Sequence, residues 1–181
     1  SGTPQSPIIM SKYGDSNEVP VIQGPGTSES ATITLHNQEY WEIKNLEITN
    51  FEPVEPDESP SWKKRGIYII AKNAGAINHI HLKNLEVHHV NSYQADFDSR
   101  YYGGIYFSVE GNAEKTWFKD VLVENCHIYQ VTRTGLSTNS SWWKRSKYSD
   151  FGDKIGKDSN GNPVYDNWVP SQNVIFKNNR L

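Results

Sequence analysis

The segment ADFDSR, residues 95–100, carries two acids whose spacing could serve chemistry. Asp96 and Asp98 are separated by one residue, which in an extended loop brings both carboxylates to one side. Cleavage of a glycosidic bond uses two carboxyl groups about 5 to 9.5 Å apart, and Glu110 is the candidate for the second one. The same oxygens could bind calcium, the one cofactor that we consider. Solvated surface acids are the remaining alternative.

Basic side chains in neighbouring segments allow a second chemistry. Arg133 falls in a turn before a predicted strand, and Lys144 and Arg145 follow it in the chain. Elimination at a uronic acid requires a base at the proton α to the carboxylate and a cation that stabilises the resulting charge. Lysine and arginine in exposed loops more often only increase solubility, so both interpretations stay open.

Aromatic side chains in these segments could stack on sugar rings. Trp142 and Trp143 open one long insertion, Tyr101 and Tyr102 close another, and Trp62 belongs to a third loop. Large aromatic rings bury extensive apolar area, so they can equally anchor a loop onto the body of the protein. Sugar contact and loop anchoring are therefore both retained.

We expect structural or surface roles for the histidines, and we predict no metal ligands among them. His88 and His89 end a predicted strand, while His81 and His127 point outward from other strands. An adjacent histidine pair is a weak metal signal without acidic or cysteine partners at a definable spacing. The segment DSNGNPVYD, residues 158–166, predicts a tight hairpin at its Asn-Gly pair rather than a calcium loop, because it lacks the required glycine and closing glutamate.

Composition and charge argue against several classes of protein. The chain has 181 residues, a formal net charge of -3 and a pI near 6.1, which disfavours a nucleic-acid partner. No apolar run approaches the roughly 20 residues that cross a bilayer, so no membrane partner is predicted. The single cysteine, Cys126, excludes an internal disulfide. We expect one domain over residues 1–181.

Four segments of the chain can be superposed without gaps. They are WEIKNLEI, IHLKNLEV, VLVENCHI and VIFKNNRL, which start at residues 41, 80, 121 and 174. Each predicts two strands of period 2, joined by a turn at an asparagine, a residue that tolerates the left-handed backbone conformation. A repeat of this length predicts stacked coils, that is, a β-solenoid with parallel sheets.

Three further segments, each with a glycine at its start, predict a third kind of strand. They are GIYII, GGIYFSV and TGLSTN, at residues 66–70, 103–109 and 134–139. Alternation places Tyr68, Tyr106 and Ser137 side by side on the outside of one sheet. The long insertions flank this sheet, so a groove is expected there. The predicted substrate-binding residues are Tyr68, Tyr101, Tyr106, Trp142, Trp143, Lys144 and Arg145, and the predicted catalytic residues are Asp96, Asp98, Glu110 and Arg133.

The segment GIYIIAKNAGAINHIHLKNLEVHHV, residues 66–90, resembles the right-handed parallel β-helix of the pectin-lyase-like superfamily. The segment PIIMSKYGDSNEVPVIQG, residues 7–24, resembles the first coil of its secreted bacterial members. The resemblance covers nearly the whole chain and implies an all-β fold, a substrate cleft on the sheet beside the long loops, and a secreted or periplasmic protein. It does not fix the chemistry, because the superfamily includes lyases, glycoside hydrolases, esterases and phage adhesins.

The chain has no recognisable C-terminal cap. A solenoid needs caps because its terminal coil otherwise exposes strand edges and core. Leu181 falls at an apolar strand position with nothing after it, so we expect an N-terminal fragment of a longer solenoid. The remaining coils of that β-helix, as a second chain or lost, would be its partner, and capping by dimerisation is the alternative.

Two functions fit these features. The first is a polysaccharide-degrading enzyme, with a glycoside hydrolase slightly favoured over a lyase because the groove is not strongly cationic. The alternative is a noncatalytic carbohydrate-binding or adhesin β-helix. Both take a polysaccharide or oligosaccharide as partner.

Overall fold

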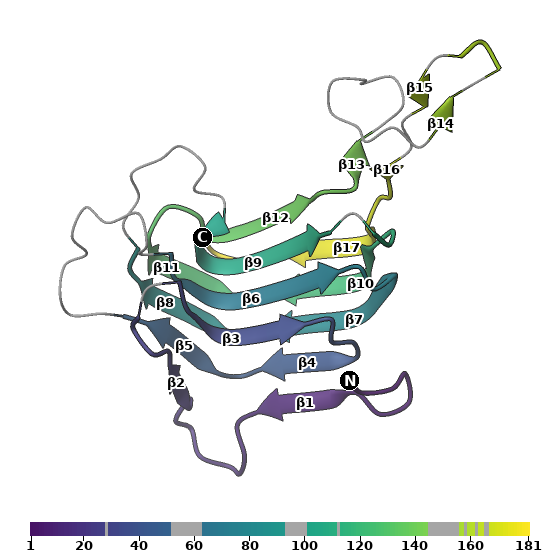
Figure 1. The fold of residues 1–181 in the computed structure, drawn as a ribbon. Helices are drawn as coiled ribbons and strands as arrows, with labels where there is room; N and C mark the ends of the chain where they lie inside the picture. The colour runs from purple at the N-terminus through teal and green to yellow at the C-terminus, as the bar shows by residue number, and fades with distance from the viewer. Residues whose placement is uncertain are drawn as a thin grey trace.

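The chain folds into an all-β, right-handed parallel β-helix, as the repeat predicts (Figure 1). The structure is a computed structural model that describes residues 1–27, 29–51, 63–92, 101–111, 113–144, 156–157, 159–161, 163–164 and 167–181. Among the described residues, four coils contribute one strand to each of three parallel sheets, and one further strand extends the first sheet at its C-terminal end (Figure 1). Within the described ranges, no helix is long and apolar enough to span a membrane.

The three sheets are numbered in the order in which the chain passes through them within one coil. Sheet 1 contains β1 (Ile8–Ser11), β4 (Trp41–Lys44), β7 (Ala76–Lys83), β10 (Trp117–Glu124) and β17 (Gln172–Lys177). Sheet 2 contains β2 (Val21–Gln23), β5 (Glu47–Asn50), β8 (Glu86–Val90) and β11 (His127–Val131). Sheet 3 contains β3 (Ala31–His36), β6 (Arg65–Lys72), β9 (Gly103–Glu110) and β12 (Leu136–Ser140).

Two antiparallel pairs stand outside the sheets. They are β13 (Trp143–Lys144) with β16 (Asn167–Trp168), and β14 (Gly156–Lys157) with β15 (Pro163–Val164). The second pair confirms the hairpin predicted at Asn160 and Gly161, where Gly161 has a φ of 82°. A positive φ of this kind is the conformation for which glycine is favoured.

The sequence repeat corresponds to the register of sheet 1. Trp41 pairs with Ile80, Ile80 with Val121, and Val121 with Val174, so the gapless superposition is confirmed. Alternate residues of these strands therefore point into the solenoid, each in line with its counterpart in the next coil. Ile43, Leu82 and Val123 are such residues, and none of them is exposed to solvent. Each fully buried side chain of this size contributes about 1.5–3 kcal/mol to folding.

Asparagine side chains link the turns that follow β4, β7 and β10. Asn45, Asn84, Asn125 and Asn178 have φ values of 57°, 52°, 55° and 55°, as their left-handed turns predict. The side-chain amide of Asn84 donates to Asn45 at 3.0 Å, and that of Asn125 donates to Asn84 at 3.4 Å. The amides therefore bind neighbouring coils to each other where the chain turns.

The glycines that begin the strands of sheet 3 also lie in one row. The register of β6, β9 and β12 places Gly66, Gly104 and Gly135 beside one another. A Cβ on Gly104 would lie 2.5 Å from both the Gly135 carbonyl oxygen and a methyl of Ile128. Glycine is required here because the strands approach the core too closely for a side chain.

Candidate functional site

A polar cavity of about 460 Å³ lies on the outer face of sheet 3. The register places Tyr68 beside Tyr106, and Tyr106 beside Ser137, so the predicted outward row is confirmed. The described residues that line the cavity are Glu29, Lys63, Arg65, Tyr68, Tyr101, Tyr102, Tyr106, Ser108, Glu110 and Asn139. Four of the predicted site residues, Tyr68, Tyr101, Tyr106 and Glu110, are thus brought together.

Glu110 is the acceptor at the end of a short chain of hydroxyl groups. The Tyr68 hydroxyl donates to Glu110 Oε1 at 2.8 Å, and the Ser108 hydroxyl donates to the same oxygen at 2.9 Å. The Tyr106 hydroxyl donates in turn to Ser108 at 3.3 Å. Both described donors meet Oε1, so the carboxylate is oriented through one of its two oxygens.

The two tyrosines keep their protons over the physiological range. Burial, followed by the hydrogen bond to Glu110 and its charge, raises the pKa of Tyr68 far above its ordinary value. Burial is also the main cause that raises the pKa of Tyr106. A neutral phenol can donate a hydrogen bond, so both tyrosines act as donors in the cavity.

Aromatic rings build the wall of the cavity. The rings of Tyr68 and Tyr106 stack with centroids 5.3 Å apart and planes 11° apart, while Tyr101 meets Tyr106 edge-on at 5.7 Å. Tyr106 is only 3% exposed, so most of its ring supports the wall instead of facing solvent. Tyr68 and Tyr101 are less buried and offer the larger contact surface.

Arg65 is a cavity residue that the sequence analysis missed. Its guanidinium carbon lies 4.3 Å from the centre of the Tyr68 ring, and its Nε donates to the Tyr101 carbonyl oxygen at 2.6 Å. The sequence feature that could have indicated Arg65 is its position directly before Gly66, at the start of a strand of sheet 3. Its positive charge balances the acids Glu29 and Glu110 in a cavity of mixed sign.

The other predicted residues have different positions. Arg133 lies between β11 and β12 with an exposed side chain, and it is not among the described residues that line the cavity. Trp143 and Lys144 form β13, of which only the backbone is described. Asp96, Asp98, Arg145 and Trp62 lie outside the described residues.

Trp142 packs into the hydrophobic core. It is 5% exposed, and its carbonyl oxygen accepts a hydrogen bond from the amide of Val169 at 2.8 Å. This position favours the loop-anchoring alternative for Trp142 over direct sugar contact, because a buried ring has no free face to offer.

A larger cavity, of about 590 Å³, lies inside the solenoid and has a different character. Its lining includes the core-facing residues Phe107, Val109, Phe118 and Val121, together with Val174 of β17. The described lining also includes Thr138, Asn139, Ser140 and Ser171 but no charged side chain, whereas hydrolysis of a glycosidic bond requires carboxyl groups. The polar cavity on sheet 3 is therefore the better candidate for glycan binding.

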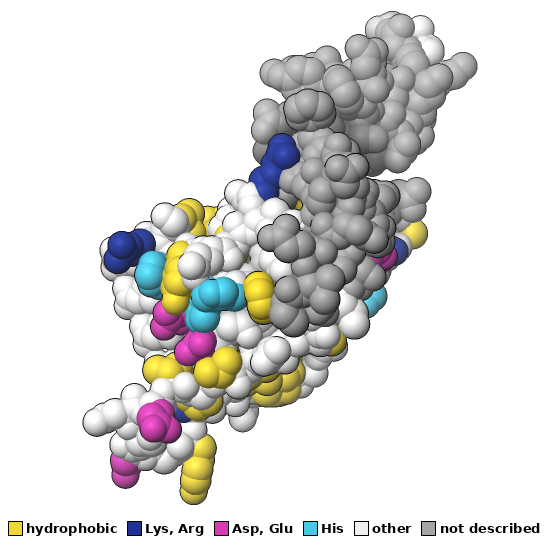
Figure 2. All heavy atoms as spheres, turned by 90° about the vertical axis from the view of Figure 1, so that its left-hand side faces the viewer, with side chains coloured by type: hydrophobic (Ala, Val, Ile, Leu, Met, Phe, Trp, Pro, Cys, Tyr) yellow, Lys and Arg dark blue, Asp and Glu magenta, His cyan; other side chains and the backbone are white. Residues whose placement is uncertain are grey.

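Sheet 2 carries histidine, acidic and hydrophobic side chains on its outer face, as Figure 2 shows for the side where β5, β8 and β11 lie. His88 is 8% exposed and meets Glu47 Oε1 at 3.0 Å, while Tyr129 donates to Glu86 at 2.6 Å. The ring of His127 stacks on Tyr129 at 4.4 Å. These contacts fit the structural and surface roles predicted for His88 and His127.

Among the described residues, one group has side chains of the kind and spacing that hold a metal ion. It contains Glu42, His79 and His81, which lie on sheet 1 and not in the polar cavity. The sequence feature that could have indicated this group is the pair of histidines two residues apart on one strand. Its acidic neighbour comes from another coil and is visible only in the fold.

Comparisons with known proteins identify relatives of this chain. A lacto-N-biosidase of Bifidobacterium longum subsp. longum is 24% identical over 209 residues, which cover 84% of this chain and 13% of that protein. The crystal structure of the native GH136 lacto-N-biosidase from Eubacterium ramulus matches with a TM-score of 0.72 and 25% identity, over 98% of this chain and 32% of that chain. Its selenomethionine derivative matches with a TM-score of 0.71. The chain is similar to part of a glycoside hydrolase.

These relatives support the coarser part of the sequence interpretation. They are carbohydrate-active enzymes, and the solved ones share the fold of this chain. Their names do not bear on the pectin-lyase-like superfamily, and no family model matches the chain. The chain spans about a third of the solved relative and a smaller share of the curated one.

Proposed function

We propose that this chain is part of a secreted or periplasmic glycoside hydrolase that binds an oligosaccharide in the polar cavity on sheet 3. The observation that carries the proposal is the stacked pair Tyr68 and Tyr106 beside Glu110, whose carboxylate is held by two hydroxyl donors. An apolar ring face and an oriented carboxylate are the two features that sugar recognition and glycosidic cleavage need. Similarity to lacto-N-biosidases supports hydrolysis over elimination.

Four residues of the cavity have roles in this proposal. Tyr68 and Tyr101 bind the sugar through their rings, and Arg65 donates to its hydroxyl groups. Glu110 is one of the two carboxyl groups that hydrolysis requires. For the second one, Asp96 and Asp98 remain the predicted candidates.

A noncatalytic glycan-binding cavity is the second candidate function. One observation favours it: Glu110 already accepts two hydrogen bonds within the protein, which suits a carboxylate that positions a ligand without reacting. The chain would then bind a glycan but would not cleave it.

The proposal is tested by incubating the protein with oligosaccharides that serve as substrates for lacto-N-biosidase activity and with uronic-acid polysaccharides. New reducing ends without ultraviolet absorbance of unsaturated products are expected. Substitution Glu110→Gln should lower the rate at least about 100-fold, the usual contribution of a catalytic acid or base.

The matched control is Glu86→Gln, since Glu86 also accepts a hydrogen bond from a tyrosine, but on sheet 2. Its rate should equal that of the unmodified protein. Glycan binding with no product would support the noncatalytic function, and unsaturated products would contradict a hydrolase.

A further inference from the structure

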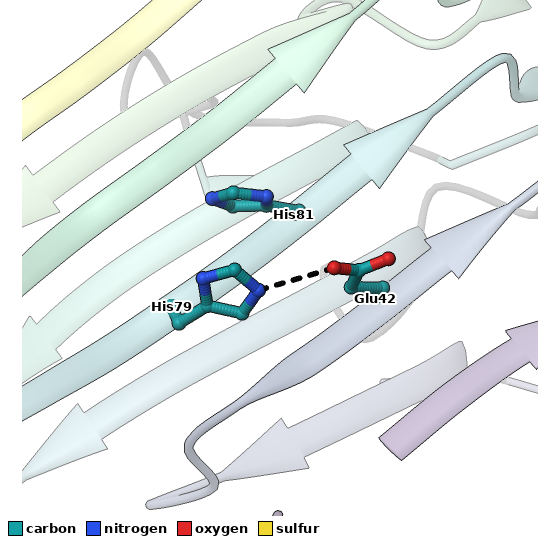
Figure 3. Close-up of side chains that lie close together, drawn as sticks. All are labelled: Glu42, His79 and His81. Atoms are coloured by element: carbon teal, nitrogen blue, oxygen red, sulfur yellow. Dashed lines mark hydrogen bonds and ion pairs between the residues drawn. The ribbon is translucent and has the colours of Figure 1, made fainter. Parts of the chain in front are cut away.

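Two histidines and two acids gather on the outer face of sheet 1, away from the polar cavity. His79 and His81 come from β7, Glu42 from β4 and Asp120 from β10. The register places Glu42 directly beside His81, because the three strands are neighbours in the sheet. Figure 3 shows the ring of His79 facing the Glu42 carboxylate, with His81 on the same strand.

The two nitrogens of His79 meet different acids. Its Nε2 lies 3.3 Å from Glu42 Oε1, and its Nδ1 lies 2.9 Å from Asp120 Oδ2. Metal-binding histidines commonly donate one ring N–H to a carboxylate and bind the ion through the other nitrogen. Asp120 thus orients His79 so that Nε2 is directed to the side of Glu42.

Glu42 and Asp120 each have a second carboxylate oxygen that contacts a neighbouring polar side chain. Lys44 forms an ion pair with Glu42 Oε2 at 3.1 Å, and the amide of Asn173 donates to Asp120 Oδ1 at 3.0 Å. Each acid therefore has one oxygen held from behind and one oxygen near the histidines. Such outer contacts are typical of sites that hold a metal ion.

The backbone at this place has an unusual conformation. His79 and Asp120 have φ values of 52° and 64°, and Tyr40 and Asn173 in the adjoining coils have values of 58° and 51°. Residues other than glycine adopt this region at a cost, and such residues cluster at functional sites. The pairing of β7 with β10 keeps one register on both sides of His79 and Asp120, so the backbone turns locally at these two residues without an inserted residue.

We propose that Glu42, His79 and His81 bind a single Zn²⁺ ion, or a similar transition metal ion, that joins the coils of β4 and β7. Two imidazoles and one carboxylate suit zinc, whereas calcium and magnesium prefer oxygen ligands alone. One ligand atom from each residue lies within 4.8 Å of the others. Zinc bonds of about 2.0–2.2 Å place two ligands at most about 4.4 Å apart, so small side-chain rotations complete the site. Water takes the fourth position.

The test uses the full chain without an affinity tag, treated with EDTA and dialysed. Titration with Zn²⁺ in a calorimeter, and against a chromophoric chelator, should give one ion per chain. Zn²⁺ should also raise the melting temperature, because a ligand that binds only the folded state stabilises it. Failure to bind one Zn²⁺ per chain would overturn the proposal.

Variants locate the ion. His79→Asn keeps the left-handed backbone, since asparagine tolerates it, and it should weaken Zn²⁺ binding by at least about tenfold, as should Glu42→Gln. The control is His36→Gln, an exposed histidine of β3 on sheet 3, which should bind as the unmodified protein does.

Folding of each variant is checked by its circular dichroism spectrum and its melting temperature without metal. If a folded His79→Asn or Glu42→Gln variant binds Zn²⁺ as tightly as the unmodified protein, the ion lies elsewhere and the proposal is wrong. The test does not depend on hydrolysis, so its result is distinguishable from the fate of the proposed function.

Discussion

At the scale of single residues, Glu110 and Trp142 show how differently two predicted site residues are placed. Glu110 lines the polar cavity, where neutral hydroxyl donors orient its carboxylate. Trp142 lies among core residues, although its sequence context at the start of a long insertion resembles that of a groove residue. The environment, more than the residue type, decides which of the two can meet a ligand.

Trp142→Ala should therefore act on stability. Removing a buried aromatic ring of this size costs about 3–5 kcal/mol in the free energy of unfolding. Trp142→Phe should cost less, because the indole Nε1 has no hydrogen-bond partner within the described structure. Urea unfolding measures the difference, and glycan affinity of the folded variants should remain unchanged. Weaker glycan binding at unchanged stability would instead indicate direct sugar contact.

At the scale of secondary-structure elements, the strands of sheet 3 are positioned by a row of glycines. Gly66, Gly104 and Gly135 allow β6, β9 and β12 to begin close to the core and to neighbouring backbone. These strands then present their outward residues as the floor of the polar cavity. The glycine row thus sets how closely these strands approach the core, and with it the position of the floor of the polar cavity.

Gly104→Ala and Gly135→Ala form a matched pair that tests this link. A Cβ at position 104 meets a backbone oxygen at 2.5 Å, whereas at position 135 the nearest atom is a side-chain methyl of Leu181 at 3.2 Å. We expect Gly104→Ala to lower the free energy of unfolding by about 1–3 kcal/mol, the range for overpacking, and Gly135→Ala to change it less. Equal losses, measured by urea unfolding, would contradict the steric explanation.

At the scale of the whole molecule, lateral pairing between coils is the main source of order. Each of the three sheets consists of equivalent strands from successive coils, and their inward residues form one continuous core. Cys126 lies in that core, 2% exposed, beside the turn that leads from sheet 1 to sheet 2. Its thiol can therefore report on opening of the solenoid.

Burial raises the pKa of the Cys126 thiol above its ordinary value. The folded state has its full stability below about pH 8.5, the pKa of the thiol in the unfolded chain. Above that pH the unfolded chain releases the proton while the folded chain keeps it, so the free energy of unfolding falls as the pH rises. The unmodified protein should thus lose more stability than Cys126→Ala between about pH 7.5 and pH 9.5, measured by urea unfolding at each pH. In the native protein the thiol should also react slowly with a disulfide reagent. Equal pH dependence of the two proteins would show that the folded thiol ionises normally.

Features that depend on local conformation can be predicted from the sequence alone. Asparagine at each turn and alternating apolar residues predict the coils, and the repeat spacing aligns Trp41, Ile80, Val121 and Val174 in one row. Alternation also placed Tyr68 beside Tyr106, because side-chain direction in a strand follows from position alone.

Which side chains meet across the coils depends on how the coils pack together. His79 lies 37 residues from Glu42 and 41 from Asp120 along the chain, and their contact depends on the register and on the left-handed backbone of His79 and Asp120. The burial of Trp142 and the position of Arg65 over the Tyr68 ring are likewise set by packing between segments. Local rules fix the coil, whereas the composition of each site depends on how successive coils are stacked.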